Sequence, residues 1–287
     1  MSELAKRIGV AAIGIPVALF LIIYNDSLFA GAVAAVAVLG LHEFYKMARA
    51  KGSNPLSTAG IALGALFILA LALAFKLPGA SQWLNPAAAI AAIGVGVMAL
   101  YGSALFARKT GSLPDLSATL GGLAFVVASA GSLVAIRMFD EVGRISGAVN
   151  FPGVHWGYFV VTFFVTIWIC DSGAYFGGRA MGRHKLFERV SPKKTWEGAI
   201  TGFLFGVPAF WAFSFWLNPA FPGGDALILG ALVSSLGQIG DLAESQLKRD
   251  AGVKDSGALL PGHGGALDRF DSIMFSAPFV LLYLLLR

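Results

Sequence analysis

"ALILGALVSSLGQIGDLAESQLKRD", residues 226–250, joins an apolar run of helix length to a charged end. A helix needs about 20 mostly apolar residues to cross the hydrocarbon core of a bilayer. Polar side chains from Gln238 to Lys248 recur at helical spacing and form a stripe along one face. Asp241 lies about two turns before Lys248, which places it about 10 Å or less from the membrane boundary. The stretch therefore predicts a membrane-spanning helix with an ionisable end.

The composition of the whole chain supports this interpretation. The 287 residues are 57% hydrophobic and 13% charged, with a mean hydropathy of +0.75, whereas ordinary globular domains are about 45–50% apolar and about 25% charged. We therefore expect an all-α, polytopic integral membrane protein that forms a single transmembrane domain over residues 1–287. Cys170 is the only cysteine, which excludes an intrachain disulfide.

Nine apolar runs are candidate spans, and turn-forming residues separate them. A signal peptide is the alternative for the first run, but no convincing small-x-small cleavage site follows it, so we expect this run to be retained. The third and ninth runs are short. The nine candidates are residues 8–24, 28–48, 59–75, 86–106, 117–138, 156–177, 197–217, 226–247 and 272–286.

The basic residues divide unequally between the two sides that these nine spans define. Of the 21 Lys and Arg residues, 17 fall on the side of the N-terminus and four on the other side. Positive charge is retained on the cytoplasmic side, so we expect a cytoplasmic N-terminus. This role accounts for the net charge of +5, and nucleic acid is not an expected partner.

The segment 248–271, between the last two spans, carries acids that orientation does not require. If the last helix begins near Leu267, Asp268 and Asp271 share a face of its first turn. Together with Asp241 they supply three carboxylates from two helix ends, a set that suits Mg²⁺ and substrate phosphates. Two such ions can stabilise both oxygens of a phosphoryl displacement. The alternative is a solvated loop in which these acids pair with neighbouring basic residues.

The basic loop 178–196 has a complementary composition. It contains six Lys or Arg residues and several glycines, a combination that suits a polyphosphate. Asp171 lies within the preceding span, where a carboxylate needs a partner or a metal. Topogenic charge is the alternative for the lysines, and helix capping is the alternative for Thr195 and Glu197. His42 and Glu43 lie on the same side as these two loops and could join the site, but we expect them to be a buried polar pair between helices.

These residues indicate a metal-dependent enzyme that acts on a phosphorylated compound at the membrane surface. They also resemble the signature of the phosphatidate cytidylyltransferases, or CDP-diacylglycerol synthases. The resemblance covers about a third of the chain, from Asp171 to Ser272, and departs from the family pattern at Ala266, a packing position. The matching motifs are SxLKR at 245–249, KDxG at 254–257, LPxHGG at 260–265, DRFD at 268–271, GRHK at 182–185 and SPKKT at 191–195.

The resemblance implies that CTP and phosphatidic acid react to give CDP-diacylglycerol and pyrophosphate, and that Mg²⁺ is required. The implied metal site holds two divalent cations, or one divalent and one monovalent cation. The resemblance also implies contact with membrane lipids and a homodimer. The implied catalytic residues are Asp241, Asp268, Asp271, Lys248, Arg249, Arg269 and His263. The implied CTP-binding residues are Asp171, Arg183, Lys185, Ser191, Lys193, Lys194 and Thr195. The implied metal ligands are Asp241, Asp268, Asp271 and Glu244.

Three other functions are compatible with acids at a membrane boundary. A CTP-dependent lipid kinase would transfer the γ-phosphate and release CDP. A cation-coupled transporter would place its carboxylates near the midplane, often in repeated halves, and no repeat is visible here. A non-catalytic lipid-binding scaffold is disfavoured by the carboxylate spacing. Short spans rich in Ala and Gly favour a bacterial inner membrane over the endoplasmic reticulum, with the active site on the cytoplasmic side.

Overall fold

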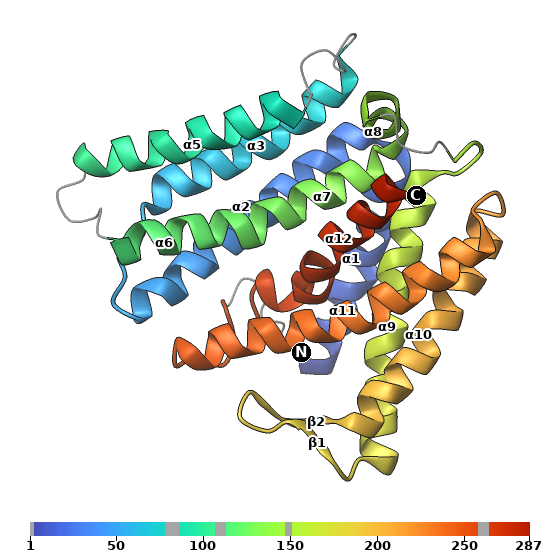
Figure 1. Ribbon diagram of the computed structural model, residues 1–287. Coiled ribbons are helices and arrows are strands. Elements are labelled where there is room, and N and C mark those ends of the chain that lie inside the picture. Colours follow the sequence, from blue (N-terminus) through green and yellow to red (C-terminus); the bar gives the residue numbers. More distant parts are fainter. Residues whose placement is uncertain (1–2, 78–85, 107–112, 147–150, 258–263) are drawn as a thin grey trace.

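The computed structural model describes residues 3–77, 86–106, 113–146, 151–257 and 264–287. The described chain is almost entirely helical (Figure 1). A five-residue π-helix, Leu123–Val127, joins two of the helices into one long span. The helices are α1 (Glu3–Tyr24), α2 (Asp26–Ala50), α3 (Ser57–Lys76), α5 (Pro86–Phe106), α6 (Leu113–Gly122), α7 (Ala128–Arg137), α8 (Phe139–Ser146), α9 (Trp156–Met181), α10 (Trp196–Leu217), α11 (Gly223–Asp250) and α12 (Leu267–Leu286).

Each of the nine predicted spans coincides with a helix or, for 117–138, with the continuous run α6–π–α7. Within the described residues, seven helical segments are long and apolar enough to cross a membrane. The other two predicted spans correspond to α1 and α5, whose described apolar stretches are the shorter Gly14–Tyr24 and Ile93–Gly102. The all-α, multi-pass membrane architecture is confirmed, and the count of nine stays a prediction.

The sequence did not predict a β-hairpin between α9 and α10. Strands β1 (Lys185–Phe187) and β2 (Ser191–Thr195) pair antiparallel, with Lys185 opposite Thr195 and Phe187 opposite Ser191. The segment has no apolar alternation, so its sequence resembled a loop. Because α9 continues to Met181, the first residues of the predicted loop 178–196 are helical. In Figure 1 the hairpin projects from the adjoining ends of α9 and α10.

Helices α9 and α10 pack closely along a seam of small residues. A side chain at Gly177 would overlap Thr201 of α10, so the glycine is required for this approach. Small residues allow helix backbones to come together in a bilayer, where van der Waals packing drives association. The seam fixes the ends of both helices and therefore the base of the hairpin.

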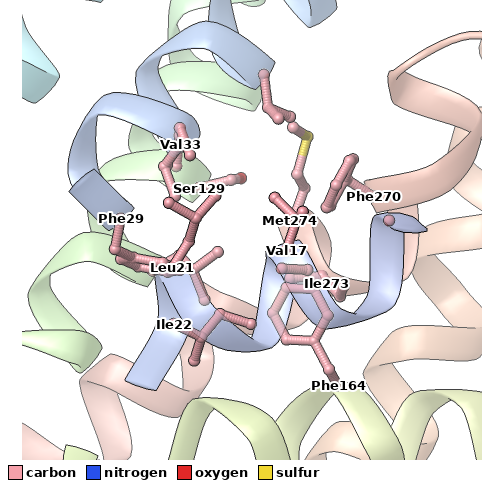
Figure 2. Close-up of a pocket in the computed structure, with 16 residues that line it drawn as sticks. Val17, Leu21, Ile22, Phe29, Val33, Ser129, Phe164, Phe270, Ile273 and Met274 are labelled. Atoms are coloured by element: carbon pink, nitrogen blue, oxygen red, sulfur yellow. The ribbon is translucent and has the colours of Figure 1, made fainter. Parts of the chain in front are cut away.

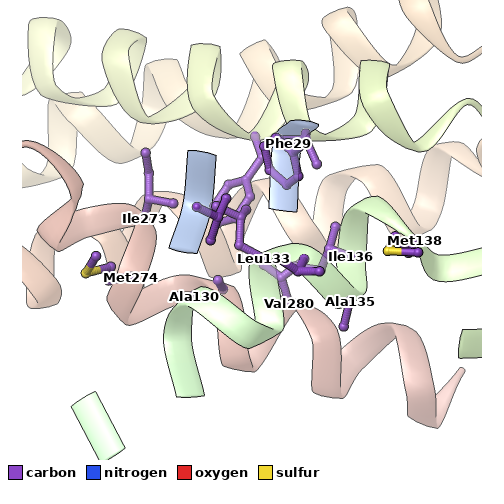
Figure 3. Close-up of a cluster of buried hydrophobic side chains, with 14 of the residues drawn as sticks. Phe29, Ala130, Leu133, Ala135, Ile136, Met138, Ile273, Met274 and Val280 are labelled. Carbon is purple, nitrogen blue, oxygen red and sulfur yellow. The ribbon is translucent and has the colours of Figure 1, made fainter. Parts of the chain in front are cut away.

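Helix α12 lies in the apolar core beside α2 and α7. Phe29, Leu133 and Ile273 bring these three helices together in the cluster of Figure 3, and all three are buried. At the start of α12, Leu267 is buried and lies against Gly40 of α2. This packing sets the first turn of α12 beside α2, while the same helix also packs along α11.

Candidate active site

The hairpin and α11 meet through an ion pair that joins the two predicted loops. Lys194 Nζ of β2 lies 2.6 Å from Asp241 Oδ2 of α11. One turn further along α11, Ser245 Oγ donates a hydrogen bond of 3.3 Å to Asp241 Oδ1. Asp171 of α9 interacts electrostatically with both members of the pair, repelling Asp241 and attracting Lys194. Three elements therefore contribute to one charged cluster.

Lys248 is the centre of a second, more buried part of the site. Its Nζ lies 2.6 Å from Glu244 Oε2 and 2.6 Å from Asp268 Oδ1. Glu244 is fully buried, and its Oε1 accepts no hydrogen bond in the described structure. The side chain of Lys248 comes from α11 and that of Asp268 from α12, so this ammonium connects the two helix ends. Removing it would leave two buried carboxylates without their shared cation.

The other oxygen of Asp268 binds described residues of the segment between α11 and α12. Asp268 Oδ2 accepts hydrogen bonds from Ser256 N (2.9 Å) and Gly265 N (2.8 Å), and it lies 3.0 Å from Ser256 Oγ. The carboxylate also lies in the first turn of α12, where the helix dipole favours negative charge. Asp268, predicted as a metal ligand, therefore has both oxygens engaged by protein groups.

Glu43 of α2 is also a member of this network, which is the alternative that the sequence did not favour. Its buried carboxylate accepts hydrogen bonds of 2.9 Å from Ala266 N, Leu267 N and Ser256 Oγ. The two backbone donors precede and begin α12, where helix N–H groups lack intrahelical partners. A side chain at Gly265 would overlap the Glu43 carboxylate, which explains the glycine there.

His42 differs from the expectation of a buried His-Glu pair because it is exposed. The sequence indicated that Glu43 needs a partner, because a carboxylate inside an apolar span is energetically costly when unpaired. The sequence could not identify the partners, because Ser256 and the start of α12 are more than 200 residues away.

Asp271 connects the two charged parts of the site. It lies close enough to both Asp241 and Glu244 for their negative charges to repel its own. Its Oδ1 accepts a hydrogen bond of 2.7 Å from Ser272 N. The arrangement therefore holds five carboxylates around the ammonium groups of Lys194 and Lys248. They are those of Asp171, Asp241, Glu244, Asp268 and Asp271.

This charge distribution fits a divalent cation. The acids outnumber the two lysines, and the buried Glu244 retains an oxygen without a hydrogen bond. No group of three Asp, Glu, His or Cys side chains is arranged to hold a metal ion within the described ranges. Mg²⁺ in proteins binds one or two carboxylates and completes its coordination with water and substrate phosphates, so the donors present suit that ion.

The hairpin base is fixed by Glu197 and Thr195. Glu197 accepts hydrogen bonds from Arg183 N (3.1 Å) and His184 N (3.2 Å), and its Oε1 lies 2.6 Å from His184 Nδ1. Thr195 is the N-cap of α10 and accepts a hydrogen bond from Gly198 N at 3.2 Å. Thr195 thus caps α10 and Glu197 lies in its first turn, as the capping alternative predicted. Arg183 itself remains exposed beside the cluster.

The remaining predicted residues divide between scaffold contacts and the surface. Lys185 Nζ donates to Pro192 O (2.6 Å) within the hairpin, and Arg249 donates to Val190 O (3.4 Å), which ties the hairpin to α11. Lys193 and Arg269 are exposed, and Ser191 is half-buried in β2. His263 lies outside the described residues.

The arrangement provides fixed cations beside fixed carboxylates at one end of α9–α12. Exposed basic groups on the hairpin can receive an anionic, phosphorylated compound, and the carboxylates can receive its accompanying cation. Phosphoryl and nucleotidyl transfer depend on such positioning and charge neutralisation.

Known proteins with similar sequences carry out this kind of chemistry. The model of the cytidylyltransferase family matches residues 5–287. A phosphatidate cytidylyltransferase of Synechocystis is 36% identical over 98% of this chain and 96% of its own length. Proteins of the same name from Bacillus subtilis and Haemophilus influenzae are 43% and 44% identical, over 52% and 43% of this chain and 59% and 44% of their own lengths. The chain therefore belongs to the cytidylyltransferase family.

Proposed function

We propose that this protein is a phosphatidate cytidylyltransferase, which transfers CMP from CTP to phosphatidic acid and forms CDP-diacylglycerol and pyrophosphate. The observation that carries the proposal is the contact of Lys194 with Asp241, which sets a basic hairpin beside the acidic ends of α11 and α12. Family membership over residues 5–287 and the names of the relatives agree with it.

The reaction requires little proton transfer. A phosphate oxygen of phosphatidic acid attacks the α-phosphorus of CTP and forms a new P–O bond. The bond from that phosphorus to the oxygen bridging the β-phosphorus breaks, and pyrophosphate leaves with the electron pair. Because the attacking phosphate is already anionic, no strong general base is needed. The barrier is the approach of two polyanions and the charge that develops on the leaving group, which fixed cations stabilise.

The site residues suggest a division of roles. Lys194, the exposed Lys193 and Arg183 would contact the phosphates of CTP from the hairpin side. The exposed Arg269 at the start of α12 would contact the phosphate of the lipid. Lys248 is shared between Glu244 and Asp268, so we assign it to holding the carboxylates in place.

We also propose that Mg²⁺ is required. One or two of Asp241, Glu244 and Asp271 would hold it together with water and substrate phosphates, with Asp171 nearby, and the bound ion would neutralise phosphate charge. The mutual repulsion of these carboxylates supports the assignment, because a cation between them would remove it.

The multi-pass helices belong in a membrane, and the bacterial relatives favour an inner membrane. We propose that the site faces the cytoplasm, because 17 of the 21 Lys and Arg residues fall on its side of the predicted topology. CTP would be available there. The homodimer that the family resemblance implies would be tested by mass measurement in detergent.

The test uses purified full-length protein in detergent with phosphatidic acid, Mg²⁺ and CTP labelled on either the α- or the γ-phosphate. We expect the α-label to enter the lipid and the γ-label to appear in pyrophosphate, with EDTA abolishing both. Entry of the γ-label into lipid, with release of CDP, would identify a lipid kinase instead. Folded protein that leaves both labels in CTP would overturn the proposal.

A further inference from the structure

A cavity of about 220 Å³ lies between α1, α2, α7, α9 and α12 (Figure 2). Its lining is apolar apart from Ser129, whose hydroxyl donates to Phe125 O at 2.5 Å within its own helix. Water is stable in a buried cavity only where several polar groups can bind it. This cavity therefore suits a hydrocarbon occupant, since an empty space of this kind forfeits packing energy.

The cavity is accessible from the lipid side along α1. Val17 lines it and is also 51% exposed on the surface of the chain. The opposite wall is formed by buried side chains, among them Val33 of α2 and Ala130 of α7. A chain of CH₂ groups could thus enter from the bilayer and contact a fixed protein wall.

The same two turns of α12 supply both a wall of this cavity and part of the candidate active site. Phe270, Ile273 and Met274 line the cavity, while Asp268 and Asp271 belong to the charged cluster. At 1.5 Å of rise per residue, these lining residues lie within about 10 Å of Asp268 along the helix. A lipid with its phosphate at the start of α12 would have its acyl chains at the level of the cavity.

We propose that this cavity is an acyl-chain subsite, which takes one fatty acyl chain of the phosphatidic acid substrate. The inference rests on the proposed function and adds to it the part of the lipid that the protein recognises. The cavity wall continues along α12 to the candidate site. A substrate whose phosphate binds beside Asp268 is therefore placed to fill the cavity, whereas the head group of a bulk lipid has no binding partner there.

Such a subsite would control which chains react and would add little to total affinity. The bilayer interior is as apolar as the cavity wall, so transfer between them yields little hydrophobic free energy. Close packing against a fixed wall discriminates by shape, because a chain that overfills the space must distort it. We therefore expect the effect in the ratio of kcat/KM values for long and short chains.

The first experiment fills the cavity by Ala130→Leu and uses Ala135→Leu as its matched control. Both alanines are buried on α7 (Figure 3), but of the two only Ala130 lines the cavity. Rates are measured with phosphatidic acids of defined chain length at a fixed surface fraction in detergent micelles. We expect Ala130→Leu to lower the long-to-short ratio roughly tenfold, the low end of what one methylene discriminates in a hydrophobic pocket. Ala135→Leu should change all rates by a common factor.

A second measurement on wild-type protein covers the case in which Ala130→Leu fails to fold. Phosphatidic acid and phosphatidylcholine, each with a photoreactive group at a chain end, are cross-linked and the labelled residues are mapped. We expect phosphatidic acid to label cavity residues such as Met274, and phosphatidylcholine to label lipid-facing residues such as Leu282, which is 52% exposed.

Equal labelling of the cavity by both lipids, or an unchanged chain-length ratio in folded Ala130→Leu, would assign the cavity to bulk lipid and overturn the subsite. Failure of the folded wild-type protein to convert phosphatidic acid of any chain length would refute the proposed function. The two failures are therefore distinguishable.

Discussion

Ser256 and Glu43 are 213 residues apart in the chain, and Ser256 Oγ donates a hydrogen bond of 2.9 Å to Glu43 Oε2. The same hydroxyl lies 3.0 Å from Asp268 Oδ2, so one serine connects a carboxylate of α2 with a carboxylate of α12. The contact holds Ser256, in the segment between α11 and α12, against α2, which contributes no other residue to the candidate site. Glu43 is thus a positioning residue, which acts through the loop and the first turn of α12.

The first prediction concerns Glu43→Gln. An amide keeps the shape of the carboxylate but has one acceptor oxygen, and its NH₂ group faces backbone donors at Ala266 or Leu267. An unsatisfied buried donor costs about 1–3 kcal/mol. We expect a lower unfolding temperature in detergent and a lower kcat, with the KM for CTP little changed because the hairpin is untouched.

His42→Gln is the matched control, since it introduces the same residue at the adjacent, exposed position. It should leave both the unfolding temperature and kcat unchanged. Wild-type kcat in Glu43→Gln, with the expected loss of stability, would reduce Glu43 to a purely structural role.

A second prediction concerns the Lys194–Asp241 pair. Lys194→Met leaves Asp241 beside Asp171 without its cation, and it removes a proposed ligand of the CTP phosphates. We expect kcat/KM for CTP to fall by roughly 10²–10³, as for other fixed groups that stabilise developing charge.

A double-mutant cycle with Asp241→Asn tests whether the two residues act together. Residues in direct contact have coupling energies of about 0.5–3 kcal/mol, whereas independent sites are additive. Additive losses in the cycle, measured on kcat/KM for CTP, would show that the 2.6 Å contact has no role in catalysis.

The sequence was informative where the chemistry is local. Asp241, Glu244 and Lys248 lie on one helix, so their spacing alone indicated that they share a face. Apolar run length located the helices for the same reason. The contacts of Glu43 and Lys194 depend instead on how helices far apart in sequence pack together, and helical periodicity carries no information about that.

The hairpin shows a second limit. Residues 185–195 lack the apolar alternation of a half-buried strand, because both faces of this two-stranded sheet are largely exposed. Basic composition and the motifs of residues 182–185 and 191–195 were the signals in this segment. They predicted an anion-binding surface without indicating the strands that direct Lys194 toward α11.

A third prediction concerns Lys248→Met. This change removes the cation that lies 2.6 Å from both Glu244 and Asp268, and breaking a buried ion pair costs about 3–5 kcal/mol because the remaining charge is uncompensated. We expect a large fraction of aggregated protein on size-exclusion chromatography. Lys254→Met, at an exposed position of the same segment, should behave as wild type. A normally folded but inactive Lys248→Met would instead favour direct contact with the lipid phosphate.

The last prediction uses the repulsion among the carboxylates. Asp271→Asn removes a carboxylate whose charge is disfavoured by its burial and by the nearby Asp241 and Glu244, so without Mg²⁺ we expect this variant to unfold at a higher temperature than wild type. It also removes a proposed oxygen ligand, so the Mg²⁺ concentration for half-maximal activity should rise at least tenfold, about 1.4 kcal/mol of binding free energy. A functional site that gains stability when a functional group is removed is expected where activity required an unfavourable arrangement.

Asp250→Asn is the control for this prediction, because Asp250 is exposed and pairs with Lys51 at 3.1 Å, outside the cluster. It should alter neither the unfolding temperature without Mg²⁺ nor the Mg²⁺ dependence. A higher unfolding temperature together with a higher Mg²⁺ requirement in Asp271→Asn would link charge repulsion to metal binding at the same carboxylate. An unchanged Mg²⁺ dependence would remove Asp271 from the ligand set, and the higher unfolding temperature would then report electrostatic strain alone.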